Sequence, residues 1–121
     1  MNIPEAVTTE IMVLSNHIYE YQKGVRNLIL YTVNERCVDK VCRKLESRKI
    51  DYLVQTVNGN NVNIFFGRPE CLAAVKTFIS KPLYRLSPEE DFILGAMLGY
   101  DICRQCERFC EQKRNSESRV C

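Results

Sequence analysis

The feature that most constrains the fold of this 121-residue chain is a tight turn between two short apolar segments. Residues 52–57 and 62–66 are rich in β-branched and aromatic side chains, and the residues between them begin with Asn58 and Gly59. An Asn-Gly pair readily takes the positive φ angles that a two-residue hairpin turn requires. The sequence therefore predicts an antiparallel β-hairpin at this point.

A third strand and two helices complete a unit around this hairpin. Residues 25–33 (VRNLILYTV) are apolar without clean alternation, which predicts a strand buried on both faces. Asn34 is placed to cap a helix that runs to about residue 49, and Pro69 is placed to open another through residue 79. Residues 25–80 then form a β-α-β-β-α unit, which is a ferredoxin-like split unit without its last strand. Its sheet has the strand order 1-3-2, and the free edge of the first strand needs to be covered by a helix or a second subunit.

A helix is predicted before the first strand, in residues 1–24. Apolar residues recur there at alternating steps of four and three, which places them on one face of a helix. Gly24 is well placed to end this helix. With its 121 residues, the chain is predicted to be one α+β domain, residues 1–121, built on a three-stranded antiparallel sheet.

A long helix is predicted at the other end of the chain. Ser87 as N-cap, Pro88 at the first helical position and Glu90 form a capping-box pattern. We expect nothing to stop this helix before about residue 113. The prediction is one continuous helix over residues 87–113, followed by a flexible tail over residues 114–121.

Composition and charge exclude several classes of partner. Seventeen basic and fifteen acidic residues give a formal net charge of +2, so we expect no nucleic-acid partner. The longest strongly apolar stretch, residues 92–98, is far short of the roughly 20 residues that cross a bilayer, so we expect no membrane partner. The first ten residues, MNIPEAVTTE, lack the pattern of a signal peptide. Seven cysteines, an odd number in a chain without an export signal, indicate reduced thiols and a cytoplasmic protein.

Three cysteines lie within eight positions in LGYDICRQCERFCEQ (98–112). On one straight helix Cys103 and Cys110 are separated by about 10.5 Å of rise. Two thiolates on one zinc ion lie within about 4 Å of each other, so the three cysteines cannot share a metal on such a helix. At 100° per residue, a stripe of mostly small residues instead forms a groove for a second helix. The residues predicted to mediate helix packing or dimerisation are Phe92, Gly95, Ala96, Gly99, Cys103 and Cys106.

An alternative interpretation gives the cysteines a chemical role. Cys103 and Cys106 have the C-x-x-C spacing of thiol-redox motifs, and a metal or iron–sulfur site would add Cys110 and Cys121 or a partner chain. Redox thiols of this kind gain acidity from a helix N-terminus, whereas the continuous helix predicted here places them past its middle. We therefore predict no metal and no other cofactor.

Other candidate ligand-binding residues are isolated. His17, the single histidine, has Glu20 three residues further along the helix, and Arg68 precedes a helix start that can hold an anion. No nucleophile elbow, phosphate-binding loop or carboxylate pair accompanies them, so a catalytic function is not favoured. A third hypothesis, binding of a small ligand beside the sheet, rests on analogy with ferredoxin-like regulatory domains.

Three stretches of the chain together resemble a known family: HIYEYQKGVRNLILYTV (17–33), VNIFFGRPECLAAV (62–75) and LSPEEDFILGAMLGYDICRQCERFC (86–110). This is a small bacterial family of about this length, described only as a domain of unknown function. The resemblance implies three strands, about five helices and a homodimer, and it implies no activity or ligand. The sequence thus predicts a non-enzymatic, homodimeric protein-interaction or regulatory module, whose partners are a second copy and an unknown protein.

Overall fold

The computed structural model describes residues 5–57 and 59–118. It confirms an α+β fold, which within these residues has five α-helices and a three-stranded sheet. The elements are α1 (Glu5–Gln22), β1 (Leu28–Asn34), η1 (Glu35–Cys37), α2 (Val38–Ser47), β2 (Tyr52–Thr56), β3 (Asn61–Gly67), α3 (Pro69–Lys76), η2 (Leu83–Arg85), α4 (Pro88–Met97) and α5 (Ile102–Ser118). None of the helices in this part of the chain is long and apolar enough to cross a membrane.

The predicted hairpin supplies the centre and one edge of the sheet. β3 lies between β1 and β2 and pairs antiparallel with both, so the strand order 1-3-2 expected from the sequence is confirmed. Gly59 has a φ of +84°, the left-handed conformation that an Asn-Gly turn predicts, while Asn58 lies outside the described residues. Within the described residues no further strand pairs with the outer edge of β1 or of β2.

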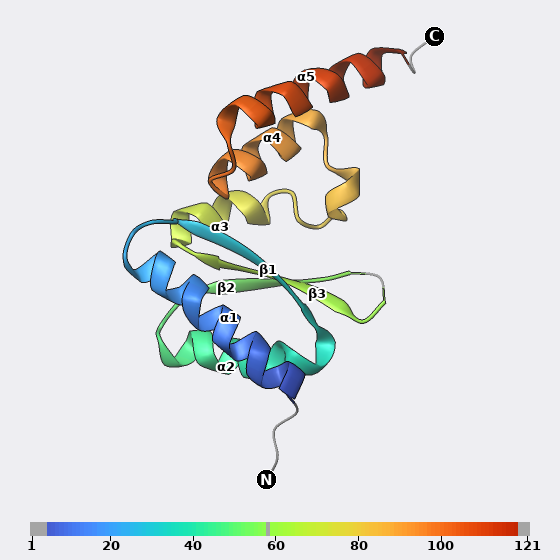
Figure 1. Cartoon of the computed structure of the whole chain (residues 1–121). Helices are drawn as coiled ribbons and strands as arrows, with labels where there is room; N and C mark the ends of the chain where they lie inside the picture. The colour runs from blue at the N-terminus through green and yellow to red at the C-terminus, as the bar shows by residue number, and fades with distance from the viewer. Residues whose placement is uncertain (1–4, 58, 119–121) are drawn as a thin grey trace.

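The sheet separates two hydrophobic cores. Figure 1 shows α1 and α2 below the sheet and α3 and α4 above it. Along β1, Ile29 and Tyr31 belong to the core under α1 and α2, whereas Leu28 and Leu30 belong to the core under α3 and α4. Because successive side chains of a strand point to opposite faces, an uninterrupted apolar run is what a strand between two cores requires. The helix after β1 and the helix after β3 therefore cover opposite faces of the sheet.

The end of α4 differs from the sequence-based expectation. The helix expected to be continuous over residues 87–113 is interrupted, because α4 ends at Met97 and α5 begins at Ile102, after four intervening residues and in a new direction. Gly99 has a φ of +81°, and the N–H groups of Gly99 and Tyr100 donate to the carbonyls of Ala96 and Gly95. These two bonds form a Schellman motif, which terminates a helix at a glycine.

A separate cap begins α5. The Asp101 carboxylate accepts a hydrogen bond from the Arg104 N–H at 2.9 Å. Gly99 and Asp101 are thus a stop signal and a start signal, whereas the prediction treats Gly99 as a residue of a helix groove. The predicted start of α4 is confirmed, including its capping box. Residues 114–118 continue α5 instead of forming the predicted flexible tail.

Candidate interaction surface

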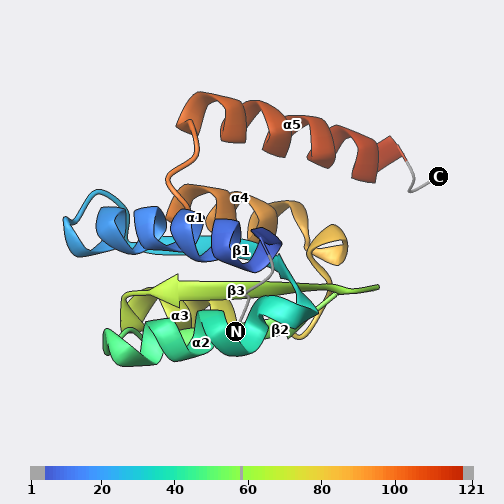
Figure 2. The same cartoon turned by 60° about the horizontal axis from the view of Figure 1, so that its bottom comes forward.

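α4 and α5 pack against each other as an antiparallel helical hairpin at one end of the molecule. The rings of Phe92 and Phe109 lie 5.7 Å apart between centroids. A Cβ atom at Gly95 would lie 2.0 Å from Oε1 of Gln105, so the glycine leaves room for the Gln105 side chain to lie against α4. In Figure 2, α5 is the outermost layer, beyond α4. No described residue of α5 is buried, and α5 packs mainly against α4.

Two ion pairs hold the hairpin together on opposite sides. The Arg108 guanidinium donates to both carboxylate oxygens of Asp91, at 2.7 and 3.2 Å, and the hydrogen bond raises the pKa of Arg108. Lys113 Nζ donates to Glu89 Oε1 at 2.8 Å, which lowers the pKa of Glu89 and raises that of Lys113. Glu89 and Asp91 are about 200° apart around α4, so the pairs lie on either side of the helix contact. Exposed pairs of this kind fix orientation more than they add stability.

An exposed apolar surface covers the side of the hairpin that carries the Glu89–Lys113 pair. At 100° per residue, Gln105 and Phe109 face α4, and Ile102, Cys106 and Cys110 lie on the adjoining strip toward solvent. We call this surface the outer flank; it consists of Phe92, Ile93, Ala96, Ile102, Cys103, Cys106, Phe109 and Cys110, all exposed or half-buried. Ile93 is 46% exposed and Ile102 is 54% exposed, which is unusual for isoleucine.

The six residues predicted to mediate packing divide between two environments. Phe92, Ala96, Cys103 and Cys106 belong to the outer flank. Gly95 is buried against Gln105 inside the hairpin, and Gly99 caps α4. The predicted groove on one helix is therefore a surface shared by two helices.

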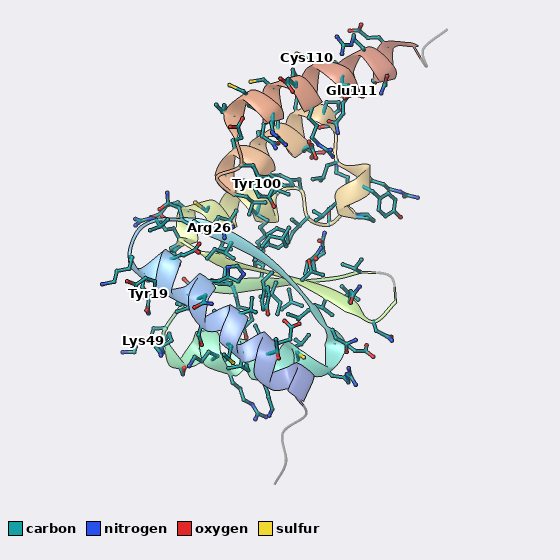
Figure 3. The ribbon with its side chains drawn as sticks, viewed as in Figure 1. Tyr19, Arg26, Lys49, Tyr100, Cys110 and Glu111 are labelled. Atoms are coloured by element: carbon teal, nitrogen blue, oxygen red, sulfur yellow. The ribbon has the colours of Figure 1, made fainter. Side chains whose placement is uncertain are left out.

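The cysteines do not form a metal site in the described part of the chain. Cys103, Cys106 and Cys110 are exposed free thiols on α5, and Figure 3 shows Cys110 on the far side of the molecule from Tyr19. No group of three His, Cys, Asp or Glu side chains in the described residues is placed to bind one metal ion. Cys121, the fourth predicted candidate, lies outside the described residues.

His17 and Glu20 lie near each other on α1, and each has another neighbour. His17 packs its ring edge-on to Tyr31, with 5.3 Å between centroids, and its Nδ1 atom is buried without a hydrogen-bond partner among the described residues. Burial, followed by the charge of Arg26, lowers the pKa of His17, and the charge of Glu20 opposes this shift. Glu20 itself pairs with Arg26 at 3.5 Å. His17 thus lies at the margin of the core.

Arg68 lies on a different element from His17 and Glu20. It is the residue that precedes α3, and its exposed side chain pairs with Glu70 at 3.3 Å. The structure therefore does not gather the three weak ligand candidates into one site. Arg68 has its own carboxylate partner at the helix start where an anion was expected.

Comparison with known families identifies the chain. Residues 12–112 match the family described as Protein of unknown function (DUF2023). The chain belongs to the DUF2023 family. The matched range contains the whole sheet and most of the α4/α5 hairpin, and the family description assigns it no activity. No curated protein matches the chain.

Sequence reasoning missed three large apolar residues of the outer flank of this DUF2023 protein. On one continuous helix Ile93 and Ile102 lie beside the predicted stripe and not on it, and Phe109 stands among charged residues. The available signal was the pair Gly99 and Asp101, because a break there turns one stripe into a hairpin with two sides. With that break placed, Phe109 falls opposite Phe92.

Proposed function

We propose that this DUF2023 protein is a non-enzymatic, cytoplasmic interaction module that forms a homodimer through its outer flank. The observation that carries the proposal is the exposure of large apolar side chains on a hairpin whose outer helix has no fully buried residue among those that the structure describes. Exposed apolar patches of this kind mark interaction sites. The free thiols of the six described cysteines are consistent with a reducing compartment.

The apolar composition of the outer flank suits a dimer whose two-fold axis passes through this surface. In an isologous dimer the same surface meets itself, so Ile93 and Ile102 each appear twice in the interface. Covering these half-exposed side chains gives on the order of 1 kcal/mol each before the cost of association is subtracted. Glu89 and Lys113, which lie beside the outer flank, pair with each other within one chain.

Analytical ultracentrifugation at micromolar concentration tests the dimer. We expect a species of twice the 14.1 kDa chain mass for the wild type, and a monomer for the double variant Ile93→Glu/Ile102→Glu. Met12→Glu is the matched control, because Met12 is an exposed apolar residue on α1, away from the hairpin. A monomeric wild type contradicts the dimer. A double variant that stays dimeric contradicts the outer flank and points to another surface, such as the open edge of β1.

A second candidate function, thiol–disulfide exchange, is favoured by the position of Cys103. Because α5 begins at Ile102, Cys103 is the second residue of the helix and Cys106 is the fifth. Both thiols therefore lie in the first two turns of α5, and the objection that they lie past the middle of one continuous helix no longer applies. In such a reaction the Cys103 thiolate displaces one thiolate from a substrate disulfide, and the Cys106 thiolate then displaces the other, which leaves a Cys103–Cys106 disulfide.

Alkylation rates separate thiol chemistry from a purely structural role. Cys110 lies two turns further along the same exposed helix and serves as the internal control. Thiol exchange predicts that Cys103 reacts with iodoacetamide at least tenfold faster than Cys110 at pH 7. Equal rates contradict it. Elemental analysis of anaerobically purified protein tests the metal and iron–sulfur alternatives at the same time.

A further inference from the structure

Three polar side chains cross the sheet in register, on the face that otherwise packs against α3 and α4. Thr32 of β1 is opposite Asn63 of β3, and Asn63 is opposite Gln55 of β2. Thr32 Oγ1 donates to Asn63 Oδ1 at 2.6 Å, and Asn63 Nδ2 donates to Gln55 Oε1 at 3.0 Å. Asn63 is 6% exposed and Gln55 is 9% exposed. Buried amides on an apolar face cost free energy unless their hydrogen bonds are made. We therefore consider which partner each amide hydrogen and oxygen has.

The bonds of Gln55 have a structural explanation. Its Nε2 donates to the carbonyl oxygens of Ile79 and Lys81, both at 2.9 Å, which fastens the segment after α3 to the sheet. Both hydrogens of that amide are therefore used. Asn63 differs, because the bond to Gln55 uses only one of the two hydrogens of its Nδ2. The second hydrogen of Asn63 and the remaining lone pair of Gln55 Oε1 are left as an adjacent donor and acceptor.

These two amides line a cavity of about 300 Å³ between the hairpin and the segment that precedes α4. Its lining residues are Gln55, Thr56, Val57, Asn63, Pro82, Leu83 and Tyr84. The polar groups come from the strands, the apolar walls come mainly from residues 82–84, and none of the lining side chains carries a charge. A volume near the lower end of the range of about 300–1,000 Å³ for small-molecule sites suits a single ring.

We infer that this cavity binds a small uncharged aromatic ring with a carboxamide or lactam edge. The carbonyl oxygen of that edge accepts from Asn63 Nδ2, and its N–H donates to Gln55 Oε1. The ring packs against Leu83 and the aromatic face of Tyr84. A charged ligand is disfavoured, because the lining side chains offer no opposite charge to offset its desolvation. This site goes beyond the proposed self-association and does not depend on it.

An NMR titration of the ¹⁵N-labelled full chain with benzamide tests the inference. We expect saturable shifts of the Asn63 and Gln55 side-chain amides and of the backbone amides of residues 82–84 that have them, with a Kd on the order of millimolar for a ligand of about nine non-hydrogen atoms. Benzoate, which has the same shape with a negative charge, should bind at least tenfold more weakly. Equal binding of benzoate, or benzamide shifts that neither saturate nor cluster at these residues, overturns the inference.

Two variants locate the binding within the cavity. Tyr84→Ala removes a wall residue that is 73% exposed, so the fold is retained, and we expect the Kd for benzamide to rise about three- to tenfold. Asn63→Leu removes the donor and should raise the Kd by about tenfold or more. Tyr19→Ala is the matched control, because Tyr19 is an exposed tyrosine on α1, across the sheet from the cavity (Figure 3). Equal effects of Tyr84→Ala and Tyr19→Ala contradict the site even if Asn63→Leu unfolds the protein.

Discussion

The sheet with its covering helices buries side chains on both faces, whereas α5 buries none among its described residues. In the first region, each strand of the sheet contributes to both cores, so the loss of one contact lowers the stability of the whole sheet region. In the second, the contacts include one ring pair, the Gly95–Gln105 contact and two exposed ion pairs. The difference indicates that the sheet carries the stability of the chain, while the hairpin is the region that gains most from an added partner.

The largest expected effect contrasts two phenylalanines. Phe65 of β3 is fully buried, and Phe65→Ala should lower the free energy of unfolding by about 3–5 kcal/mol. Phe109 of α5 is half-buried, and Phe109→Ala should cost about 1 kcal/mol. Urea denaturation followed by circular dichroism measures both. Similar costs would contradict the view that α5 lies outside the cooperative core.

An intermediate effect is expected from separating the two helices of the hairpin. Gly95→Leu fills the space that the Gln105 side chain occupies against α4, so the contact between α4 and α5 should loosen. In hydrogen exchange, α5 amides should lose protection while β3 amides keep theirs. Ala96→Leu, the same added side chain at the exposed neighbouring position, should leave α5 protected. Loss of β3 protection in Gly95→Leu would show that the regions are coupled.

The smallest expected effect is a difference in pH response. The pKa of His17 is lowered from its ordinary 6.5, so the unfolded chain binds this proton more tightly and the stability of the sheet region falls as pH drops below about 6.5. The pKa of Glu89 is lowered from 4.5, so its pairing with Lys113 persists above about pH 4.5 and is lost only as pH falls further. Between pH 6 and 5, therefore, the unfolding free energy should decline while the NMR shifts of α5 stay constant. His17→Phe should remove that decline; a decline that remains assigns it to another group.

Much of the fold could be predicted because local signals agreed with tertiary structure. The β2–β3 hairpin, the apolar run of β1 and the capping box of α4 are each signalled by one segment of the sequence, and each is confirmed. The helix break could not be placed by hydrophobic periodicity, because Gly99 continues the small-residue stripe that it interrupts. The positive φ of Gly99 and the cap at Asp101 determine where the helix breaks. The same holds for the cavity, since Gln55 and Asn63 become neighbours only through the strand register.

The polar row across the sheet also has a consequence for how the strands align. Leu28, Ile29, Leu30 and Tyr31 are apolar on both sides of β1, so sliding this strand by one residue would still bury apolar groups in each core. Hydrophobicity alone therefore specifies the alignment weakly. The bond from Thr32 to Asn63 exists in only one alignment, and a slipped strand would leave the Asn63 oxygen buried without its donor. The Thr32 hydroxyl therefore disfavours misaligned strand pairing during folding. The apolar side chains of the strands would otherwise tolerate such misalignment.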